Sequence, residues 1–147
     1  MAGARIAGHP IHPILIVFPL GLFAMAVIFD IIALVTGNPN LSVAAYYMIG
    51  AGIIAGLLAA VFGLIDWTGI NPGERARTIG AWHGLGNVVV VVLFAISWWL
   101  RKSNPTAPTG GALTASYIGV LLGLVTGWLG GELVFRHGVG VEAPPRA

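Results

Sequence analysis

The side chains of this sequence that could do chemistry are four histidines and a few carboxylates, in a chain that has no cysteine. Two of them, His9 and His12, stand in the stretch Gly-His-Pro-Ile-His-Pro, immediately before a long apolar run. Imidazoles and carboxylates bind haem iron or divalent metals, whereas the missing thiols exclude disulfides, iron-sulfur clusters and covalently attached haem. No nucleophile-base pair or phosphate-binding loop is present, so an electron carrier or an accessory subunit is favoured over an enzyme.

The elements that must position these groups are four apolar segments that make up most of the chain. Of the 147 residues, 57% are hydrophobic and only 8% are charged, which is far from the composition of a soluble globule. Each segment is long enough to cross a bilayer as a helix. The sequence therefore predicts an all-α integral membrane protein with one domain over residues 1–147 and spans at about 13–36, 41–67, 79–100 and 112–135.

Short connections rich in glycine, proline and asparagine separate these segments, so consecutive helices must run antiparallel. The predicted fold is a four-helix up-down bundle with both termini on the same side. That side collects Arg5, Arg75, Arg77, Arg136 and Arg146, and the other side collects Arg101 and Lys102. The positive-inside rule then predicts that both termini are cytoplasmic and that the bundle spans the inner membrane of the cell. These positive charges do not form the clustered stripe of a nucleic-acid binder.

Because the helices alternate in direction, most of the polar residues are expected at one end of the bundle. These are His9, His12, Asp66, His83, Glu132 and His137. On the third segment, helical spacing puts Gly80, His83, Gly84 and Asn87 on one face, which should look into the bundle. Asn87 lies about halfway along its span, where an unsatisfied amide is costly. We expect it to have a partner on another helix or a ligand.

Three interpretations of this polar end are open. In the first, a b-type haem is held by His83 and by a histidine of another helix, within a layer that contains His9, His12, His83, Asn87 and His137. In the second, a divalent metal is bound by His12, His83, His137, Asp66 and Glu132. In the third, the chain binds no cofactor and packs as an accessory subunit of a larger membrane complex.

Several carboxylates also have simpler expected roles. Asp66 could cap its helix or pair with Arg75 or Arg77, and Glu132 could pair with Arg136 one helical turn away. Asp30 lies near the opposite end of the first segment, and is expected to bond to the loops there or to Tyr46, with a proton relay as the alternative role.

Small residues recur along two of the segments, which is how helices approach one another closely in lipid. The fourth segment carries Ala115, Gly119, Gly123, Gly127 and Gly131, and the second carries Gly52, Gly56 and Ala60. These seams could serve packing within the bundle, contact between copies of the chain, or a flat ligand such as a porphyrin.

The stretches "GHPIHPILIVFPLGLF", "GLIDW", "WHGLGN" and "GWLGGELVFRHGVGV" resemble the bacterial membrane-protein family catalogued as domain of unknown function 2231. The resemblance covers all four spans. Many relatives look like "HPMLVHFP", with a further histidine where this chain has Val17. Some relatives are joined to Rieske iron-sulfur or cytochrome c domains, so the resemblance implies a redox or respiratory membrane setting and redox partners, without identifying a cofactor.

Overall fold

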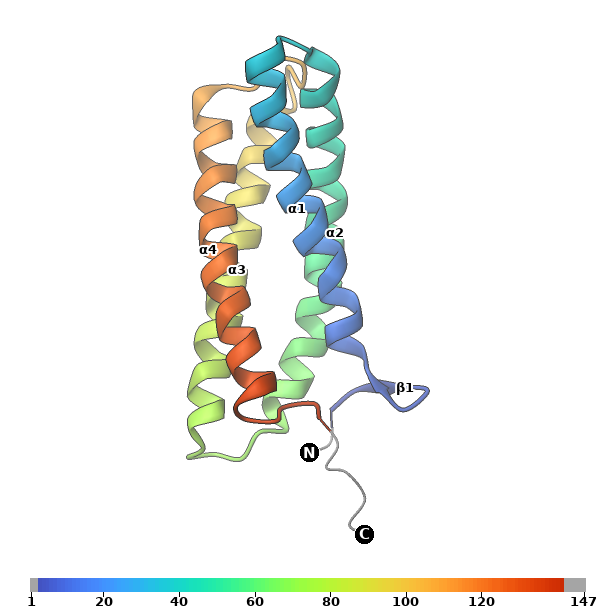
Figure 1. The fold of residues 1–147 in the computed structure, drawn as a ribbon, viewed down its shortest axis with the longest axis vertical. Coiled ribbons are helices and arrows are strands. Elements are labelled where there is room, and N and C mark those ends of the chain that lie inside the picture. The colour runs from blue at the N-terminus through green and yellow to red at the C-terminus, as the bar shows by residue number, and fades with distance from the viewer. Residues whose placement is uncertain (1–2, 142–147) are drawn as a thin grey trace.

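The computed structural model describes residues 3–141, and four long helices account for most of them (Figure 1). Their bounds are α1, Ile11–Thr36; α2, Pro39–Thr68; α3, Arg75–Arg101; and α4, Gly110–Phe135. Each predicted span lies inside one of these helices, and all four helices are long and apolar enough to cross a membrane. The predicted all-helical up-down bundle is therefore confirmed.

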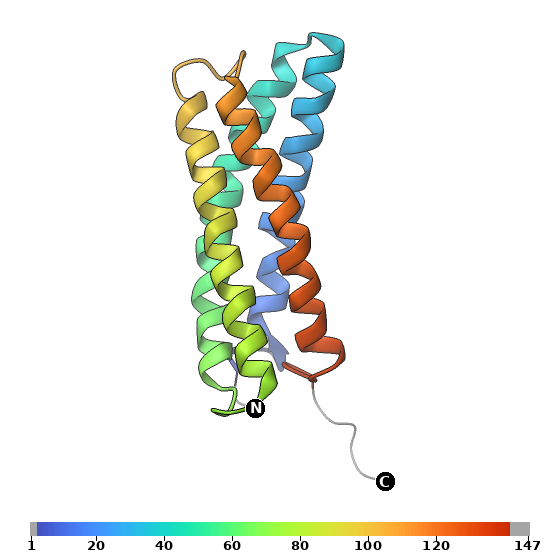
Figure 2. The ribbon, with the colours of Figure 1, turned by 90° about the vertical axis from the view of Figure 1, so that its left-hand side faces the viewer.

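The helices form two hairpins, α1 with α2 (the first hairpin) and α3 with α4 (the second hairpin). Contacts within each hairpin are extensive, those between α2 and α3 are fewer, and those between α1 and α4 are fewer still. The start of α1, the α2–α3 connection and the end of α4 lie together at one end of the bundle (Figures 1 and 2). We call this the histidine end, and the other the charged end.

Turn and capping residues at the charged end terminate one helix and begin the next. Gly37 takes the left-handed conformation that ends α1, with a φ of 70°. The side chain of Asn38 then accepts a hydrogen bond from the N–H of Asn40, and Pro39 occupies the first turn of α2. Thr109 caps α4 by accepting from the N–H of Ala112. These caps hold the helix ends of both hairpins in place.

A small β-hairpin precedes α1. Strand β1, Arg5–Ile6, pairs antiparallel with β2, His9–Pro10. Ala7 and Gly8 turn the chain between them with positive φ values of 48° and 81°. The turn matches the twist of the two strands, which is why both central residues have positive φ.

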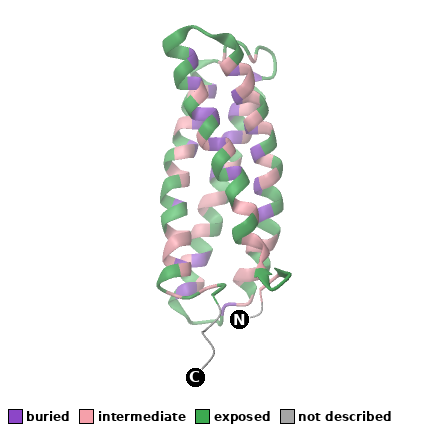
Figure 3. Cartoon of the chain, turned by 45° about the vertical axis from the view of Figure 1, so that its right-hand side comes forward, coloured by how far each residue is buried: buried purple, intermediate pink, exposed green. Residues whose placement is uncertain are grey.

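The interior of the bundle is filled by a core in which two phenylalanines meet. Phe23 of α1 stacks on Phe94 of α3 with ring centroids 3.9 Å apart and planes 3° from parallel. Ala26, Ala45 and Ile49 are fully buried around them. Exposed residues lie along the outside of all four helices (Figure 3). Many of them are large and apolar, as a lipid-facing surface requires.

Candidate functional site

A hydrogen-bonded network at the histidine end joins the two helices of the second hairpin. The Nδ1–H of His83 donates to the carbonyl of Thr126 on α4 at 2.8 Å, so its Nε2 is unprotonated and accepts from the amide of Asn87 at 3.0 Å. The amide oxygen of Asn87 in turn accepts from the hydroxyl of Thr126 at 2.9 Å. The partner on another helix that was predicted for Asn87 is thus found on α4.

His12 occupies a similar place in the first hairpin. It lies in the first turn of α1, and its Nδ1–H donates to the carbonyl of Ala59 on α2 at 2.8 Å. The Nε2 of His12 has no hydrogen-bond partner in the described part of the chain. Because the other ring nitrogen is fixed by a backbone carbonyl, this Nε2 presents a lone pair, the form in which histidine binds metals.

The two imidazoles face each other across the bundle. Their ring centroids are 6.3 Å apart and their planes are nearly perpendicular, at 89°. Each ring lies against a glycine of its hairpin partner: a Cβ on Gly63 would lie 2.9 Å from Cε1 of His12, and one on Gly130 would lie 3.0 Å from Cε1 of His83. Because glycine has no side chain, each ring fits between the two helices of its hairpin.

The other predicted ligands are at the same end but are not gathered with these two. His9 is exposed, and its Nδ1 lies 3.0 Å from the carbonyl of Ala7 in the β-turn. His137 follows α4 and is half-buried. Glu132 pairs with Arg136 at 3.1 Å, as predicted. Within residues 3–141, no three His, Asp or Glu side chains lie close enough together to hold a metal ion.

Asp66 does not form the ion pair with Arg75 or Arg77 that the sequence suggested. Its carboxylate accepts a hydrogen bond from the N–H of Ala4 at 3.1 Å and so fixes the segment before α1 to the end of α2. Arg77 instead lies over the ring of Trp67, 4.4 Å from its centroid, and donates to the carbonyl of Ile70. The carboxylate accepts from the backbone because the segment before α1 passes directly over it.

At the charged end, Asp30 also has a different partner from those predicted. Both of its oxygens accept from the guanidinium of Arg101 on α3, each at 2.7 Å, and both side chains are fully buried. The Nε–H of Arg101 donates to Ser97, and one terminal nitrogen donates to Ser116 on α4. Arg101 was predicted among the charges at one side of the bundle, but it belongs to the bundle interior, where a charge requires a partner.

The glycine seams are only partly used for packing inside the bundle. Gly52 and Gly119 lie against Phe23 and Phe94, whereas Gly123 and Gly127 have no neighbour where a Cβ would be. Gly84 is exposed, so the predicted inward face of α3 contains Gly80, His83 and Asn87 but not Gly84.

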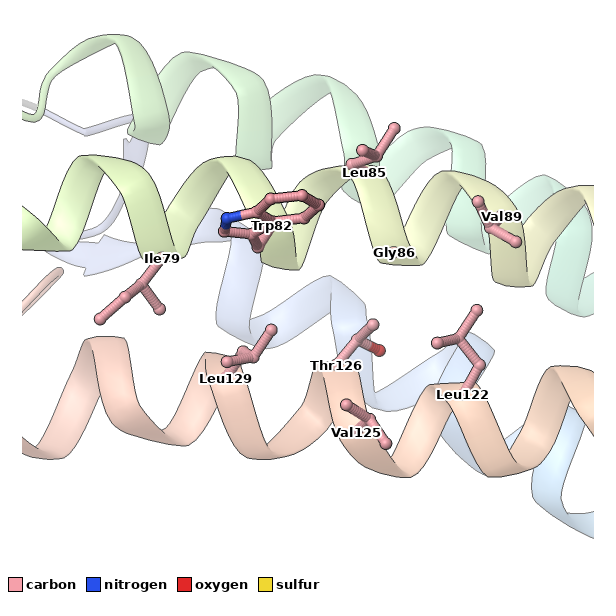
Figure 4. A pocket seen from close by; sticks show the side chains of 9 residues that line it. All are labelled: Ile79, Trp82, Leu85, Gly86, Val89, Leu122, Val125, Thr126 and Leu129. Carbon is pink, nitrogen blue, oxygen red and sulfur yellow. The ribbon is translucent and has the colours of Figure 1, made fainter.

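An apolar groove runs between α3 and α4 on the outside of the bundle (Figure 4). Gly86 and Thr126 lie where the two helices approach, and exposed side chains such as Trp82 and Val125 flank them. No histidine lines this groove or the small one beside Asp66. The rings of His12 and His83 therefore do not line either groove.

Sequence reasoning missed two residues that complete these networks, Thr126 and Arg101. A signal existed for each. Thr126 is a hydroxyl within a run of glycine and aliphatic residues, and Arg101 is a charge opposite to that of Asp30 at the same end of the bundle. Nothing in the sequence indicated that the carbonyls of Ala59 and Thr126 accept from the two histidines, because every residue carries a backbone carbonyl.

Four apolar helices with polar networks in their interior define a multi-pass membrane protein. The chain belongs to the family described as predicted membrane protein, DUF2231, whose model matches residues 8–143. The family resemblance seen in the sequence is thereby confirmed. Comparison with curated proteins and with solved structures gave no match.

Proposed function

We propose that this protein is a b-type haem-binding electron-transfer subunit, in which His12 and His83 would hold the haem. One observation carries the proposal: two imidazoles from separate hairpins face each other, and each has its Nδ1–H fixed on a backbone carbonyl. That arrangement orients each ring and, in the neutral form, leaves its lone pair on Nε2, as a carbonyl that accepts from the other ring nitrogen does for metal-binding histidines.

The separation of the rings is consistent with this role. An imidazole nitrogen binds a first-row metal at about 2.0–2.1 Å, so two imidazoles on opposite sides of one ion have ring centres about 6 Å apart. The observed separation is 6.3 Å. Bound haem would supply one-electron transfer through its iron. His12 offers an open Nε2, whereas Asn87 must first release the Nε2 of His83.

The macrocycle would need space that the two described grooves do not provide beside the histidines. That space would have to come from a rearrangement of the two hairpins at the histidine end in which the two rings stay within reach of one metal ion. This is consistent with the bundle's construction, because contacts within hairpins far exceed those between α1 and α4. The flanking Gly63 and Gly130 would allow the rings to shift without a collision between backbones.

A second candidate function is a cofactor-free accessory subunit of a larger membrane complex. The network of His83 favours it, because both ring nitrogens are already satisfied by Thr126 and Asn87. In this case the histidines are structural and join helices within each hairpin. The divalent-metal alternative has less support, since Asp66 and Glu132 bond elsewhere.

Spectra of the protein purified in detergent distinguish the two candidates. We expect a Soret band that shifts on reduction with dithionite, together with resolved α and β bands. His12→Ala and His83→Ala should each abolish nearly all bound haem, because each change removes one of the two side chains that would hold it. The measurement is haem per protein in monodisperse fractions.

His137→Ala is the matched control, since this histidine lies at the same end but outside the facing pair. It should keep full haem occupancy. A colourless wild-type protein from cells with ample haem, or a His83→Ala protein that keeps its haem, would contradict the proposal. The first of these outcomes would favour the accessory subunit.

We further propose that the histidine end faces the cytoplasm of a bacterial cell. Arg5, Arg75, Arg77 and Arg136 lie at this end, and Arg146 lies outside the described residues. At the other end Lys102 is exposed, while Arg101 is buried in an ion pair. The chain has no cysteine, so one introduced thiol reports one position. In intact cells a membrane-impermeant maleimide should label Thr106→Cys and spare Glu74→Cys. The reverse pattern would invert the topology.

A further inference from the structure

Three pairs of residues that meet across the bundle share one separation in sequence. Asp30 and Arg101 form the ion pair and are 71 residues apart. The facing histidines His12 and His83, and the stacked rings Phe23 and Phe94, have the same separation. One residue of each pair is on α1 and the other on α3. The two helices therefore present equivalent positions to each other along their whole length.

Helices α2 and α4 are related by a second constant separation. Gly52 and Gly119 have it, and so do Gly63 and Gly130. Their contacts match as well. A Cβ at Gly52 would meet the ring of Phe23, and one at Gly119 would meet the ring of Phe94. Gly63 and Gly130 lie against the rings of His12 and His83 in the same way.

Burial and hydrogen bonding repeat between the hairpins too. His12 donates to the carbonyl of Ala59, and His83 donates to the carbonyl of its counterpart Thr126, both at 2.8 Å. Ala59 and Thr126 are 1% and 2% exposed. Further counterparts are fully buried in both hairpins, among them Ala26 with Ser97 and Ala45 with Ala112.

From this correspondence we infer that the bundle consists of two equivalent helical hairpins, related by a pseudo-two-fold axis along the bundle, and that each hairpin's inner face is a recognition surface for the other, unlike hairpin. Both hairpins start at the histidine end, so the repeats are parallel and the axis lies along the membrane normal.

The charges give this surface its selectivity. Pairing of two first hairpins would bring two copies of Asp30 together in the interior, and pairing of two second hairpins would bring two copies of Arg101 together. Only the unlike pair forms the bidentate contact. A buried like-charge contact is a repulsive element of the kind that specific interfaces use against wrong partners.

The same equivalence makes the His12 site a simplified copy of the His83 site. The counterpart of Asn87 is Ile16, the counterpart of Thr126 is Ala59, and the counterpart of Gly86 is Leu15. If the backbones are equivalent, an amide at position 16 should reach Nε2 of His12, and a hydroxyl at position 59 should reach that amide. Serine is the suitable hydroxyl, because Leu15 stands where Gly86 makes room for the methyl of Thr126.

The experiment transfers this network into the first hairpin of the full-length chain. Ile16→Asn alone should lower the thermal unfolding midpoint in detergent by several degrees, because its amide oxygen has no donor. Ile16→Asn with Ala59→Ser should recover most of that loss. In ¹⁵N-labelled histidine spectra, only the double variant should show Nε2 of His12 as a firmly hydrogen-bonded acceptor.

The matched control replaces the second change by Ala60→Ser, on the adjacent exposed position of α2. It should give no recovery. If Ala59→Ser recovers no more than Ala60→Ser, the hairpins are not equivalent at this site and the inference is overturned.

A second test at the charged end applies even if the amide variants do not fold. Arg101→Asp alone should leave little folded protein, because two carboxylates then meet in the interior. Adding Asp30→Arg, with Ala26→Ser to replace the support from Ser97, should restore folded protein severalfold. Equal yields for the single and the combined variant would contradict equivalence of the two hairpins. The second test does not depend on whether haem is bound, and the first is made on haem-free protein, because haem would occupy Nε2 of His12.

Discussion

Arg101→Met should destabilise the bundle by about 3–5 kcal/mol, since it leaves the carboxylate of Asp30 buried without a partner. Both side chains of this pair have no exposed surface, and two hydrogen bonds of 2.7 Å join them. We expect most of the variant to aggregate on extraction, measured as the monodisperse fraction in detergent and by titration with a denaturing detergent.

Two comparisons separate the loss of a partner from the loss of a charge. Asp30→Leu combined with Arg101→Met removes both charges, and should be much more stable than Arg101→Met alone because no charge is stranded. Arg136→Met breaks the exposed pair with Glu132 and should change stability by about 0–1 kcal/mol. If Arg101→Met were as mild as Arg136→Met, the buried pair would not be a determinant of the fold.

Gly119→Val should destabilise the bundle by about 1–3 kcal/mol through overpacking. A Cβ at this position would lie 2.9 Å from a ring carbon of Phe94, which is closer than such atoms approach. Phe94 has no room to retreat, because it is completely buried and stacked on Phe23 at 3.9 Å. The thermal unfolding midpoint and the denaturing-detergent titration should both fall.

Gly127→Val, two helical turns further along the same seam, is the control. No atom lies within 4 Å of a Cβ built there, and the position is exposed. The variant should be as stable as the parent or slightly more so, since valine restricts the unfolded chain more than glycine does. Equal losses at Gly119 and Gly127 would show that the loss at Gly119 does not come from contact with Phe94.

Asn87 and the glycine seam of α4 show which parts of the site could be predicted from the sequence and which could not. The requirement that Asn87 find a partner follows from its place in an apolar span, and the partner was found on α4. The identity of that partner depends on how α3 and α4 are rotated about their axes. An apolar surface that faces lipid and one that faces another helix look alike in sequence, so Gly119 and Gly127 could not be distinguished in advance.

The sequence by itself determined that this is a membrane protein of four antiparallel helices, because bilayer thickness and backbone hydrogen bonding leave few alternatives for four long apolar segments. It also determined that most of the histidines and carboxylates would meet at one end, since antiparallel helices alternate. The tertiary structure alone decided that His12 and His83 face each other, that Asp66 bonds to the backbone near the chain start, and that Asp30 binds Arg101. The physical reason is that composition determines the length and direction of each span, whereas helix rotation and pairing depend on contacts between segments far apart in the chain.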